Sequence, residues 1–488
     1  MSQPISVQDN FLVYFFGYAI FAYSLLLLAS YVMLLIFSYQ YSTGCKQWSD
    51  DYIRHMVQSS PYVPGISIVA PAYNEEKTII DNVQSLLRMD YPNFEVCIVN
   101  DGSKDKTLEL LIDTFDLVEV PFEYVEKVHC APFKRLFKST NLNYAKLIVV
   151  DKVNGGTKAD AVNAGLNVID NPYFINTDVD CILSKDAMYQ CVFPVITDES
   201  IIAVSGTMSM SNGSTIDNGE LVDIRPSSRP IPLFQDLEYK RSFLVGKMGW
   251  SKINAMNNVS GGYGLFSTEV VRDAGGYSST SFAEDMDMLT RMIAYCCDFK
   301  RKYKVVQIPH NCCWTEGPSN LRMLYRQRVR WGRGLIQLMW EHRRLILNRK
   351  YKRLGLITMV YTFLFEFMAP VIEISGLLFM IYLIFTDGIN WDTFFVTFFA
   401  IYTFSFMLST FVVFYDFILG TSYTSIRSYL KLLVAAALEP IVYHPIIVVC
   451  SVVGYIKFVT RQKAVWKSME RTGMKRANSA ATPKTGTA

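Results

Sequence analysis

The feature that most limits the fold of this chain is a long apolar segment near its start. Residues 11–39 contain no charged side chain. This run is longer than the roughly 20 apolar residues that cross a bilayer as a helix. A signal peptide would begin with basic residues and carry a shorter apolar core, whereas residues 1–10 contain neither Lys nor Arg. The pattern therefore predicts a retained transmembrane helix within residues 1–41.

Three further apolar stretches lie towards the end of the chain, at about 354–385, 391–419 and 429–459. The whole chain is 51% hydrophobic and only 19% charged, whereas soluble domains average about 25% charged residues. The charge deficit belongs to the two flanks, because the middle has an ordinary soluble composition. These observations exclude a disordered chain and a plain soluble enzyme. The net charge of +3 does not indicate nucleic acid as a partner.

The distribution of basic residues predicts how the chain is oriented. Lys46 and Arg54 are the first basic residues, and they follow the N-terminal apolar segment. The positive-inside rule therefore predicts an outside N-terminus and a cytoplasmic middle domain, residues 42–352, in a multi-pass protein of the cell membrane. The same rule predicts that the basic tail, 461–488, lies on the cytoplasmic side. Three crossings by residues 353–460 would leave that tail outside, so one stretch must fold differently.

The third C-terminal stretch is the best candidate for that exception. Pro440 and Pro445 interrupt it, and proline breaks a helix. The stretch could be a crossing pair of short helices, or a re-entrant or interfacial segment. Pro370 interrupts the first stretch in the same way, so the first stretch could be the exception instead. Two topologies therefore remain open from the sequence.

Strand-like and helix-like runs alternate in the middle domain. ISIVAPAYN (66–74), FEVCIVNDGS (94–103), KLIVVDK (146–152) and PYFINTDVD (172–180) are apolar runs that end in polar residues. Helical spacing follows the first and the third of them. This alternation predicts a mostly parallel sheet with helices on both faces. Ligands bind such sheets at the carboxyl ends of the strands, so we expect the site there.

Each of these strand ends offers candidate chemistry. Asp178 and Asp180 point the same way in an extended chain, and hard carboxylate oxygens suit Mg²⁺ or Mn²⁺ bound with phosphates. Asp101 could accept a hydrogen bond from a base or ribose, or belong to a simple turn. Lys158 follows a Gly-rich turn and could contact a phosphate or only water. The first strand end, PAYNEE (71–76), includes Pro71, Ala72, Tyr73 and Glu75; its alternative reading is a helix cap.

Two later motifs complete the candidate set. Glu284 and Asp285 begin a predicted helix, where Asp285 could act as a general base or could simply cap the helix. The motif QRVRW contains Gln327, Arg328, Arg330 and Trp331. Its arginines could hold a diphosphate, or they could form a basic patch that binds anionic lipid headgroups.

The order and spacing of these motifs resemble the processive family-2 glycosyltransferases, the group that contains cellulose, chitin, hyaluronan and poly-N-acetylglucosamine synthases. The resemblance runs from about residue 64 to 335 through APAYNEE, VNDGSKDKT, NGGTKADAVNAG, NTDVD, SGGYGLF (260–266), FAEDMDM and QRVRW. The nearest likeness is to the bacterial poly-N-acetylglucosamine synthases, which WKSMERTG (466–473) also resembles. The resemblance implies an α/β GT-A catalytic domain, Rossmann-like with a mostly parallel sheet, embedded between α-helical transmembrane segments.

The resemblance also implies residue roles. Tyr73, Glu75 and Asp101 would contact the nucleotide and Lys158 its phosphates. Asp178 would contact the nucleotide sugar, and Asp180 would hold the Mg²⁺ or Mn²⁺. Asp285 would be the base beside Glu284, while Gln327, Arg330 and Trp331 would hold the diphosphate and the acceptor. SGGYGLF, with Gly261 and Gly262, would line the acceptor side. Ala283 before the acidic pair, and Tyr263 with Gly264, depart from the commoner forms of these motifs and leave the identity of the acceptor open.

The expected activity is inverting transfer from a UDP-sugar, with UDP-N-acetylglucosamine as the first choice and UDP-glucose as the second. One base suffices for a single displacement, whereas a retaining hydrolase needs two close carboxylates. The expected partners are the UDP-sugar, the growing polysaccharide, the lipid bilayer and a small accessory membrane subunit. Two alternatives remain open: a non-processive transferase that adds one sugar to a lipid carrier, and an inactive glycosyltransferase-like transporter or receptor.

Overall fold

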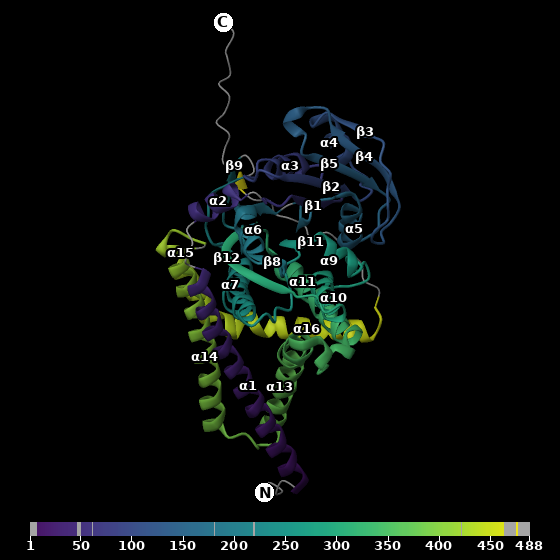
Figure 1. Ribbon diagram of the computed structural model, residues 1–488. Coiled ribbons are helices and arrows are strands. Elements are labelled where there is room, and N and C mark those ends of the chain that lie inside the picture. Colours follow the sequence, from purple (N-terminus) through teal and green to yellow (C-terminus); the bar gives the residue numbers. More distant parts are fainter. Residues whose placement is uncertain are drawn as a thin grey trace.

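The computed structural model describes residues 7–45, 50–60, 62–179, 181–217, 220–420, 422–462 and 475–476. Its two parts are a domain built around a large sheet and a set of long helices that extend from one side of it (Figure 1). The tail motif 466–473 and Asp180 lie outside the described residues.

The central sheet has ten strands in the order β3-β4-β5-β2-β1-β6-β11-β8-β12-β7. The neighbouring strands β5, β2, β1 and β6 run parallel to one another, and β8 and β12 are also parallel. The bounds are β1 Ile66–Ala72, β2 Phe94–Asn100, β3 Leu117–Val120, β4 Phe133–Ser139, β5 Leu147–Lys152, β6 Tyr173–Thr177, β7 Ile182–Leu183, β8 Ile201–Met210, β11 Tyr263–Ser267 and β12 Lys304–Thr315. A separate small sheet contains β9 Thr215–Asp217, β10 Glu220–Asp223 and β13 Lys475–Arg476.

Helices cover both faces of the central sheet, as the alternating sequence pattern predicts. The bounds are α2 Asp50–Ser59, α3 Ile79–Leu87, α4 Thr107–Thr114, α5 Lys158–Val168, α6 Ala187–Thr197, α7 Pro230–Lys240, α8 Met248–Lys252, α9 Thr268–Asp273, α10 Glu284–Asp298 and α11 Leu321–Glu341. Buried side chains of α5 and α10 share one hydrophobic cluster. Those of α3, α4 and α6 belong to another. Central strands such as β8 are buried along their whole length, which is typical of a sheet covered on both sides.

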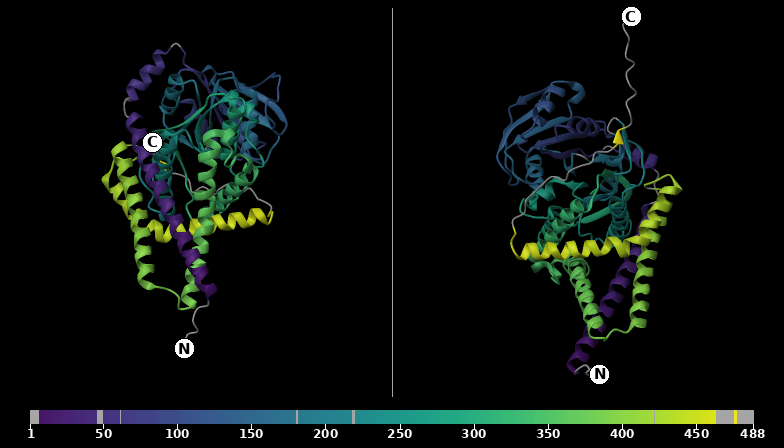
Figure 2. Two further views of the ribbon diagram at one scale, coloured as in Figure 1. Left: turned by 60° about the horizontal axis from the view of Figure 1, so that its bottom comes forward. Right: turned by 180° about the vertical axis from the view of Figure 1, so that it is seen from behind.

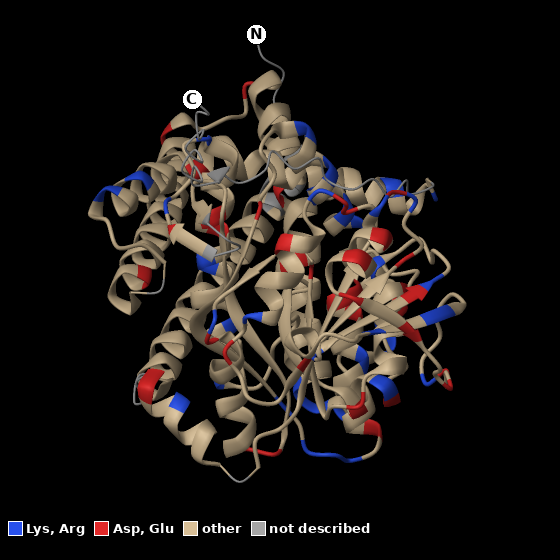
Figure 3. Cartoon of the chain, turned by 90° about the horizontal axis from the view of Figure 1, so that it is seen from above, with Lys and Arg blue, Asp and Glu red and all other residues tan. Residues whose placement is uncertain are grey.

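The strand predictions are confirmed for the four runs that lead into polar ends, which become β1, β2, β5 and β6. The sheet also contains an antiparallel strand that the sequence pattern does not reveal. β11 pairs with β6 on one side and β8 on the other. Its register sets Tyr263 opposite Thr177, so the glycines before β11 reach the carboxyl end of β6. Seen from above, acidic and basic residues are interspersed over this domain (Figure 3).

Four stretches are long and apolar enough to cross a membrane: Gly17–Cys45, Leu354–Phe385, Trp391–Leu419 and Ile426–Val459. The first stretch lies within α1 Val7–Cys45, and the others contain α12 Met359–Tyr361, α13 Met368–Phe385, α14 Trp391–Leu419, α15 Ile426–Leu438 and α16 His444–Val459. The fourth stretch is bent. α15 lies beside α14, whereas α16 runs across the base of the sheet domain (Figures 1 and 2).

The bend in the fourth stretch bears on the topology that the sequence left open. A π-helical segment, Glu439–Tyr443, contains Pro440 and separates α15 from α16. α16 then packs against α11 of the sheet domain through two glycines: a Cβ atom at Gly454 would lie 3.0 Å from Gly332 Cα. α16 therefore packs against the sheet domain instead of continuing beside α14, and an interfacial position of α16 stays a prediction.

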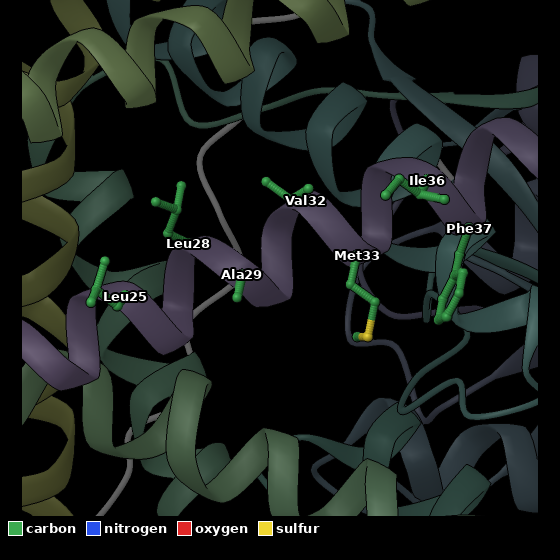
Figure 4. Close-up of a pocket in the computed structure, with 7 residues that line it drawn as sticks. All are labelled: Leu25, Leu28, Ala29, Val32, Met33, Ile36 and Phe37. Atoms are coloured by element: carbon green, nitrogen blue, oxygen red, sulfur yellow. The ribbon is translucent and has the colours of Figure 1, made fainter.

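α1 also contacts the sheet domain closely. A Cβ atom at Gly249 of α8 would lie 2.8 Å from the carbonyl oxygen of Leu34, so glycine is needed at this crossing. The same stretch of α1 lines a hollow of about 540 Å³ whose lining side chains are all apolar (Figure 4). Its lining residues are Leu25, Leu28, Ala29, Val32, Met33, Ile36 and Phe37.

Candidate active site

The carboxyl ends of neighbouring parallel strands meet at one edge of the sheet. Ala72 of β1 lies opposite Asn100 of β2, which lies opposite Asp151 of β5. The residues that follow each strand are therefore close in space. The Asn100 side-chain amide donates to Asp151 Oδ1 at 2.8 Å. This edge is where the sequence predicts a ligand.

The loop after β1 is fixed by the loop after β2. Asn74 has a φ of +58°, a left-handed conformation that Asn tolerates better than most residues. Its backbone N–H donates to Ser103 Oγ at 3.1 Å, and its side-chain oxygen accepts from the Lys104 N–H at 2.8 Å. These contacts leave the ring of Tyr73 43% exposed, so it is available to a ligand at this edge. Glu75 instead accepts a hydrogen bond from the Thr78 hydroxyl at 3.1 Å.

The other residues of this loop serve its backbone. Ala72 is buried, and its carbonyl accepts from the Asp101 N–H at 3.0 Å. Pro71 is half-buried within β1. The side chains of both residues pack against the rest of the protein. Their contact with a substrate stays a prediction.

Asp101 lies in a buried charge cluster that the sequence does not reveal. Its Oδ1 is 2.5 Å from Nζ of Lys152, a side chain with no exposed surface. The same ammonium is 2.5 Å from Asp160 of α5. The Gly155 N–H also donates to Asp101 Oδ1, at 3.0 Å. The only sequence signals for this cluster are Lys152 at a strand end and Asp160 in the first turn of α5, so their pairing has to come from the fold.

Lys158 and Asp178 meet at the end of β6. Lys158 Nζ is 2.6 Å from Asp178 Oδ1, and it also donates to the carbonyl oxygen of Gly261 at 2.6 Å. Burial disfavours the charged ammonium, but the Asp178 carboxylate outweighs it and raises the pKa of Lys158. The Asp178 side chain is 41% exposed. A lysine and an accessible carboxylate therefore share the position at which the sequence predicts the diphosphate and its metal.

Gly261 joins this pair to the predicted base. Its N–H donates to Asp285 Oδ2 at 3.3 Å, while its carbonyl accepts from Lys158. A Cβ atom here would lie 3.7 Å from Asp285 Oδ2 and 3.9 Å from Glu284 Oε1. Gly262 is more crowded, since a Cβ there would lie 2.6 Å from the methyl group of Met208. The two glycines thus form the wall between β6 and the start of α10.

Asp285 and Glu284 occupy the first turn of α10, where the helix dipole favours anions. Asp285 Oδ1 accepts from the N–H of the next residue, Met286, at 2.9 Å. The N-cap residue of α10 is Ala283, which makes no side-chain capping bond, so the predicted capping by Asp285 is wrong. Burial, and then the Asp285 charge, raise the pKa of Glu284. Two carboxyl groups this close cannot both ionise easily. The other carboxylate oxygen, Oδ2, accepts from the Gly261 N–H, and base catalysis by Asp285 stays a prediction.

The QRVRW motif of α11 contributes unequally to this edge. Arg330 Nη1 is 3.9 Å from Glu284 Oε2, whereas the half-buried ring of Trp331 stacks on the Arg328 guanidinium, whose carbon lies 4.2 Å from the ring centre. Gln327 is buried and accepts from the Gln235 amide at 3.2 Å. The resemblance implies that Gln327 binds the same ligand as Arg330, but in the structure the Gln327 side chain contacts α7.

Arg328 is held in the protein interior. Its guanidinium forms two hydrogen bonds with Glu238 of α7, at 2.6 and 2.7 Å, and a third with the Tyr443 hydroxyl at 3.0 Å. The side chain is 4% exposed. Residues two apart on a helix face opposite ways, so Arg328 and Arg330 cannot share one ligand. This geometry favours a packing role for Arg328 over the predicted contact with a diphosphate.

The expectation that all of SGGYGLF lines the acceptor side needs correction. Tyr263 has no exposed surface, and its hydroxyl lies 3.4 Å from Cys191 Sγ. Residues 263–267 form the fully buried strand β11. Only Ser260, Gly261 and Gly262 reach the site, because the strand begins immediately after them.

A metal site at this edge fits the chemistry of the available donors. Asp178 offers an accessible carboxylate, and hard oxygen ligands suit Mg²⁺ or Mn²⁺. Two other groups of possible ligands occur among the described residues, Asp50/Asp186/His310 and Asp287/Glu341/His342. The second is already bridged by an arginine, because Arg291 is 2.8 Å from Asp287. Neither group belongs to this edge of the sheet.

Accessible acids, a lysine and an arginine at the carboxyl ends of a Rossmann-like sheet, beside long apolar helices, define a membrane-associated nucleotide-sugar transferase. Residues 67–129 match the family model "Glycosyl transferase family 2", and residues 234–442 match "Glycosyl transferase family group 2". The chain is a family-2 glycosyltransferase with membrane helices, similar to the poly-N-acetylglucosamine synthases.

Two relatives and one solved structure illustrate this similarity. A poly-β-1,6-N-acetyl-D-glucosamine synthase of Staphylococcus epidermidis is 26% identical over 424 residues, which cover 85% of this chain and 89% of the relative. The Staphylococcus aureus protein of the same name is 28% identical over 288 residues, 58% of each chain. The fold is that of a mannosyltransferase from Pyrobaculum calidifontis, solved with GDP-mannose and Mn²⁺, with a TM-score of 0.50, 16% identity, and coverage of 91% of this chain and 100% of that one.

Proposed function

We propose that this protein polymerises a β-linked polysaccharide from a UDP-sugar, by inverting transfer, and passes the product across the membrane. UDP-N-acetylglucosamine is the favoured donor and UDP-glucose the second. The observation that carries the proposal is the double contact of Gly261, whose carbonyl meets Lys158 and whose N–H meets Asp285. One backbone unit thereby sets a donor-binding cation and a candidate base on either side of a single site.

The donor half of the site would hold the nucleotide. The exposed ring of Tyr73 is suited to stacking against a flat base, since aromatic faces prefer such partners. Asp101 is held in place by Lys152, and Glu75 lies in the neighbouring loop. When the donor binds, the Lys158 ammonium would shift from Asp178 to the diphosphate, because a phosphate anion competes with a carboxylate for the same ammonium.

Asp178 and Asp180 would hold Mg²⁺ or Mn²⁺ together with the diphosphate. Bound there, a divalent cation supplies positive charge that stabilises the leaving diphosphate. The support is the accessible carboxylate of Asp178 at the end of β6 and the Mn²⁺ in the complex of the related fold. Arg330 and Lys158 would contribute further positive charge from the protein itself.

Asp285 would act as the general base. The acceptor hydroxyl oxygen bonds to the anomeric carbon, its proton passes to an Asp285 carboxylate oxygen, and the bond from the anomeric carbon to the diphosphate oxygen breaks with its electron pair on UDP. One displacement inverts an α-linked donor into a β-linkage. Burial and the Asp285 charge raise the pKa of Glu284, so Glu284 would keep its proton to a higher pH than an ordinary glutamate and, when protonated, would donate a hydrogen bond to the acceptor.

The proposed location is the cell membrane, with the sheet domain in the cytoplasm and the N-terminus outside. The support is the basic sequence after α1 and the three long helices α1, α13 and α14 on one side of the sheet domain. α16 would lie at the cytoplasmic surface, which keeps the basic tail inside. A small accessory membrane subunit stays a prediction from the family resemblance.

The test is product analysis with purified protein in lipid vesicles. Radiolabelled UDP-N-acetylglucosamine, UDP-glucose and other UDP-sugars are incubated separately with Mg²⁺ or Mn²⁺, and the products are digested with linkage-specific glycosidases. We expect a ladder of β-linked N-acetylglucosamine. A single lipid-linked product would show a non-processive transferase, and no UDP release from any donor would show that the domain is inactive.

A further inference from the structure

One face of α11 is anchored to α7 by side chains that have no part in the proposed chemistry. Gln235 of α7 donates to Gln327 at 3.2 Å. Glu238 of α7 accepts two hydrogen bonds from the Arg328 guanidinium, at 2.6 and 2.7 Å. Such charge-assisted, two-pronged bonds combine strength with a defined geometry. Two consecutive residues of the QRVRW motif are therefore fixed from α7, and Trp331 follows on the same helix.

The bonds to Arg328 determine how its guanidinium is turned. All the N–H groups of a guanidinium point outward within its plane, so the groups that accept them set the orientation of that plane. Glu238 supplies two acceptors. The Tyr443 hydroxyl, from the π-helical segment Glu439–Tyr443, supplies a third at 3.0 Å and itself donates to Glu238 at 2.9 Å. Tyr443 is buried, so bulk water does not compete for these bonds.

Trp331 lies against the face of this oriented guanidinium. The guanidinium carbon of Arg328 is 4.2 Å from the centre of the Trp331 ring, which is within the range of a cation–π contact. Residues three apart on a helix lie on the same side of it, so the helical spacing brings the pair together. Glu238 and Tyr443 thus fix a plane on which one face of the indole ring rests.

The remainder of Trp331 is open to a ligand. Its side chain is half-buried, and no hydrogen bond joins its indole N–H to any other residue that the structure describes. An aromatic ring with a free polar edge can contact both the apolar face and the hydroxyl groups of a sugar. The adjacent residue, Arg330, approaches Glu284 on the transfer side. This neighbourhood supports the proposed role of Trp331 as a contact for the acceptor.

From these contacts we propose that Glu238 and Tyr443 are positioning residues of the acceptor site, and that they act through Arg328 and Trp331. They orient the guanidinium, the guanidinium holds one face of the indole ring, and the ring contacts the terminal sugar of the acceptor. Neither Glu238 nor Tyr443 touches that sugar. The inference rests on the proposed polymerisation and deepens it by naming residues that set the affinity for the acceptor.

A second tyrosine on α7 provides a matched control. The Tyr423 hydroxyl donates to Asp236 of α7 at 2.9 Å, and both residues are buried. The bond has the same length and the same chemistry as the bond between Tyr443 and Glu238. Among the described residues, no hydrogen bond, ion pair or ring contact joins the Tyr423–Asp236 pair to Arg328 or Trp331.

The experiment compares Y443F with Y423F in the full chain, in lipid vesicles. The transfer rate is measured against the concentration of an added β-linked N-acetylglucosamine oligosaccharide and, separately, of UDP-N-acetylglucosamine. We expect Y443F to raise the acceptor KM about threefold or more, which corresponds to the loss of part of one cation–π contact. The donor KM should stay within about twofold, since donor binding does not involve this contact. Y423F should behave as wild type in both measurements.

The double variant Y443F/W331F separates positioning from packing. Phenylalanine keeps an aromatic ring, so W331F should retain measurable transfer. Residues that act through one another give non-additive effects, so Y443F should leave the acceptor KM of W331F almost unchanged. The same rise in acceptor KM with and without Trp331 would overturn the inference, and so would equal effects of Y443F and Y423F.

Fluorescence gives a second readout that needs no transfer. The Trp331 signal is the difference between each protein and its W331F form, and quenching by acrylamide reports how well the ring is covered. Y443F should raise this quenching about twofold, because the guanidinium no longer holds the ring, whereas Y423F should leave it as in wild type. E238Q sets an amide NH₂ against the guanidinium donors, so it should raise the quenching further.

E238Q also keeps the inference open to contradiction if Y443F fails to fold. Equal quenching of Trp331 in wild type and in the folded variants would overturn the positioning role. Failure of wild type to transfer any sugar would count against the proposed function. In that case the quenching result alone would decide whether Glu238 and Tyr443 position Trp331.

Discussion

The two halves of the candidate site, the donor side around Asp101 and the transfer side around Asp285, differ in how their charged side chains are paired. On the donor side, Lys152 is within 2.5 Å of both Asp101 and Asp160, and all three side chains are buried. On the transfer side, Asp285 accepts only from the N–H groups of Gly261 and Met286 among the described residues. Arg330 approaches Glu284 no closer than 3.9 Å.

This difference shows how one site can be both rigid and reactive. A buried network with internal partners specifies one geometry, because any loss leaves a charge without compensation. Carboxylates that contact only backbone N–H groups keep lone pairs for a reacting hydroxyl. The donor half would therefore hold the nucleotide in one fixed geometry. In the transfer half, the acceptor hydroxyl would supply the hydrogen bonds that the carboxylates still lack.

Replacement of Asp285 by Asn is expected to have the largest effect. Asn keeps the shape of the side chain but cannot take up the acceptor proton, so transfer should fall about 10²- to 10⁴-fold. UDP affinity, measured by calorimetry, should stay within about twofold, since the donor half is untouched. Transfer within tenfold of wild type would show that Asp285 is not the base.

Lys152→Met removes the buried cation of the donor half. It leaves Asp101 and Asp160 buried without their cation, and removal of one partner from a buried ion pair costs about 3–5 kcal/mol. We expect a large drop in the thermal unfolding midpoint of the protein in detergent. Lys350→Met is the control: this lysine and its partner Asp298 have side chains that are 59% and 37% exposed, so about 1 kcal/mol or less should be lost. Equal effects would remove the contrast between the two pairs.

The two arginines of α11 offer the same contrast within one helix. Arg328→Met breaks a buried double hydrogen bond with Glu238 and should lower the unfolding midpoint. Arg330→Met should leave the midpoint near wild type but slow transfer about 10- to 100-fold, since hydrogen bonds to charged groups contribute about 1.5–3 kcal/mol. A stable Arg328→Met protein with slow transfer would instead restore Arg328 to the substrate site.

Lys247 gives the effect that depends most on pH and that vanishes at high pH. Burial, only partly opposed by Asp285, lowers the pKa of Lys247 from 10.5 to about 7. Between these values the unfolded chain binds a proton that the folded chain does not, so stability should rise with pH from about 7 towards 10.5. Lys247→Met should be more stable than wild type at pH 6, and the gap should close as pH rises. A gap that does not change with pH would contradict this reading of Lys247.

Local patterns were enough to predict much of the fold and of the site. The runs that become β1, β2, β5 and β6 each end in the polar residues that meet at the sheet edge, and Asp285 begins α10 as its pattern indicates. Long-range pairings could not be predicted. β11 enters the sheet beside β6, almost a hundred residues earlier in sequence, so neither the burial of Tyr263 nor the double contact of Gly261 has a local signal.

The same limit applies to charges. Lys152 reads as the polar end of a strand, and only its packing beside α5 reveals the ion pairs with Asp101 and Asp160. Arg328 and Arg330 differ in role because α11 has one face on α7 and another on the site. Tyr443 stands in an apolar stretch, and only the fold brings its hydroxyl to Arg328 of a distant helix.

The close crossing of α11 and α16 has a mechanical consequence. Gly332 and Gly454 bring the two backbones together without intervening side chains, and α11 carries Arg330 and Trp331. In the proposed topology α16 lies flat on the bilayer surface. The lipid headgroups would then set the height of α11 relative to the membrane, and with it the position of Arg330 and Trp331.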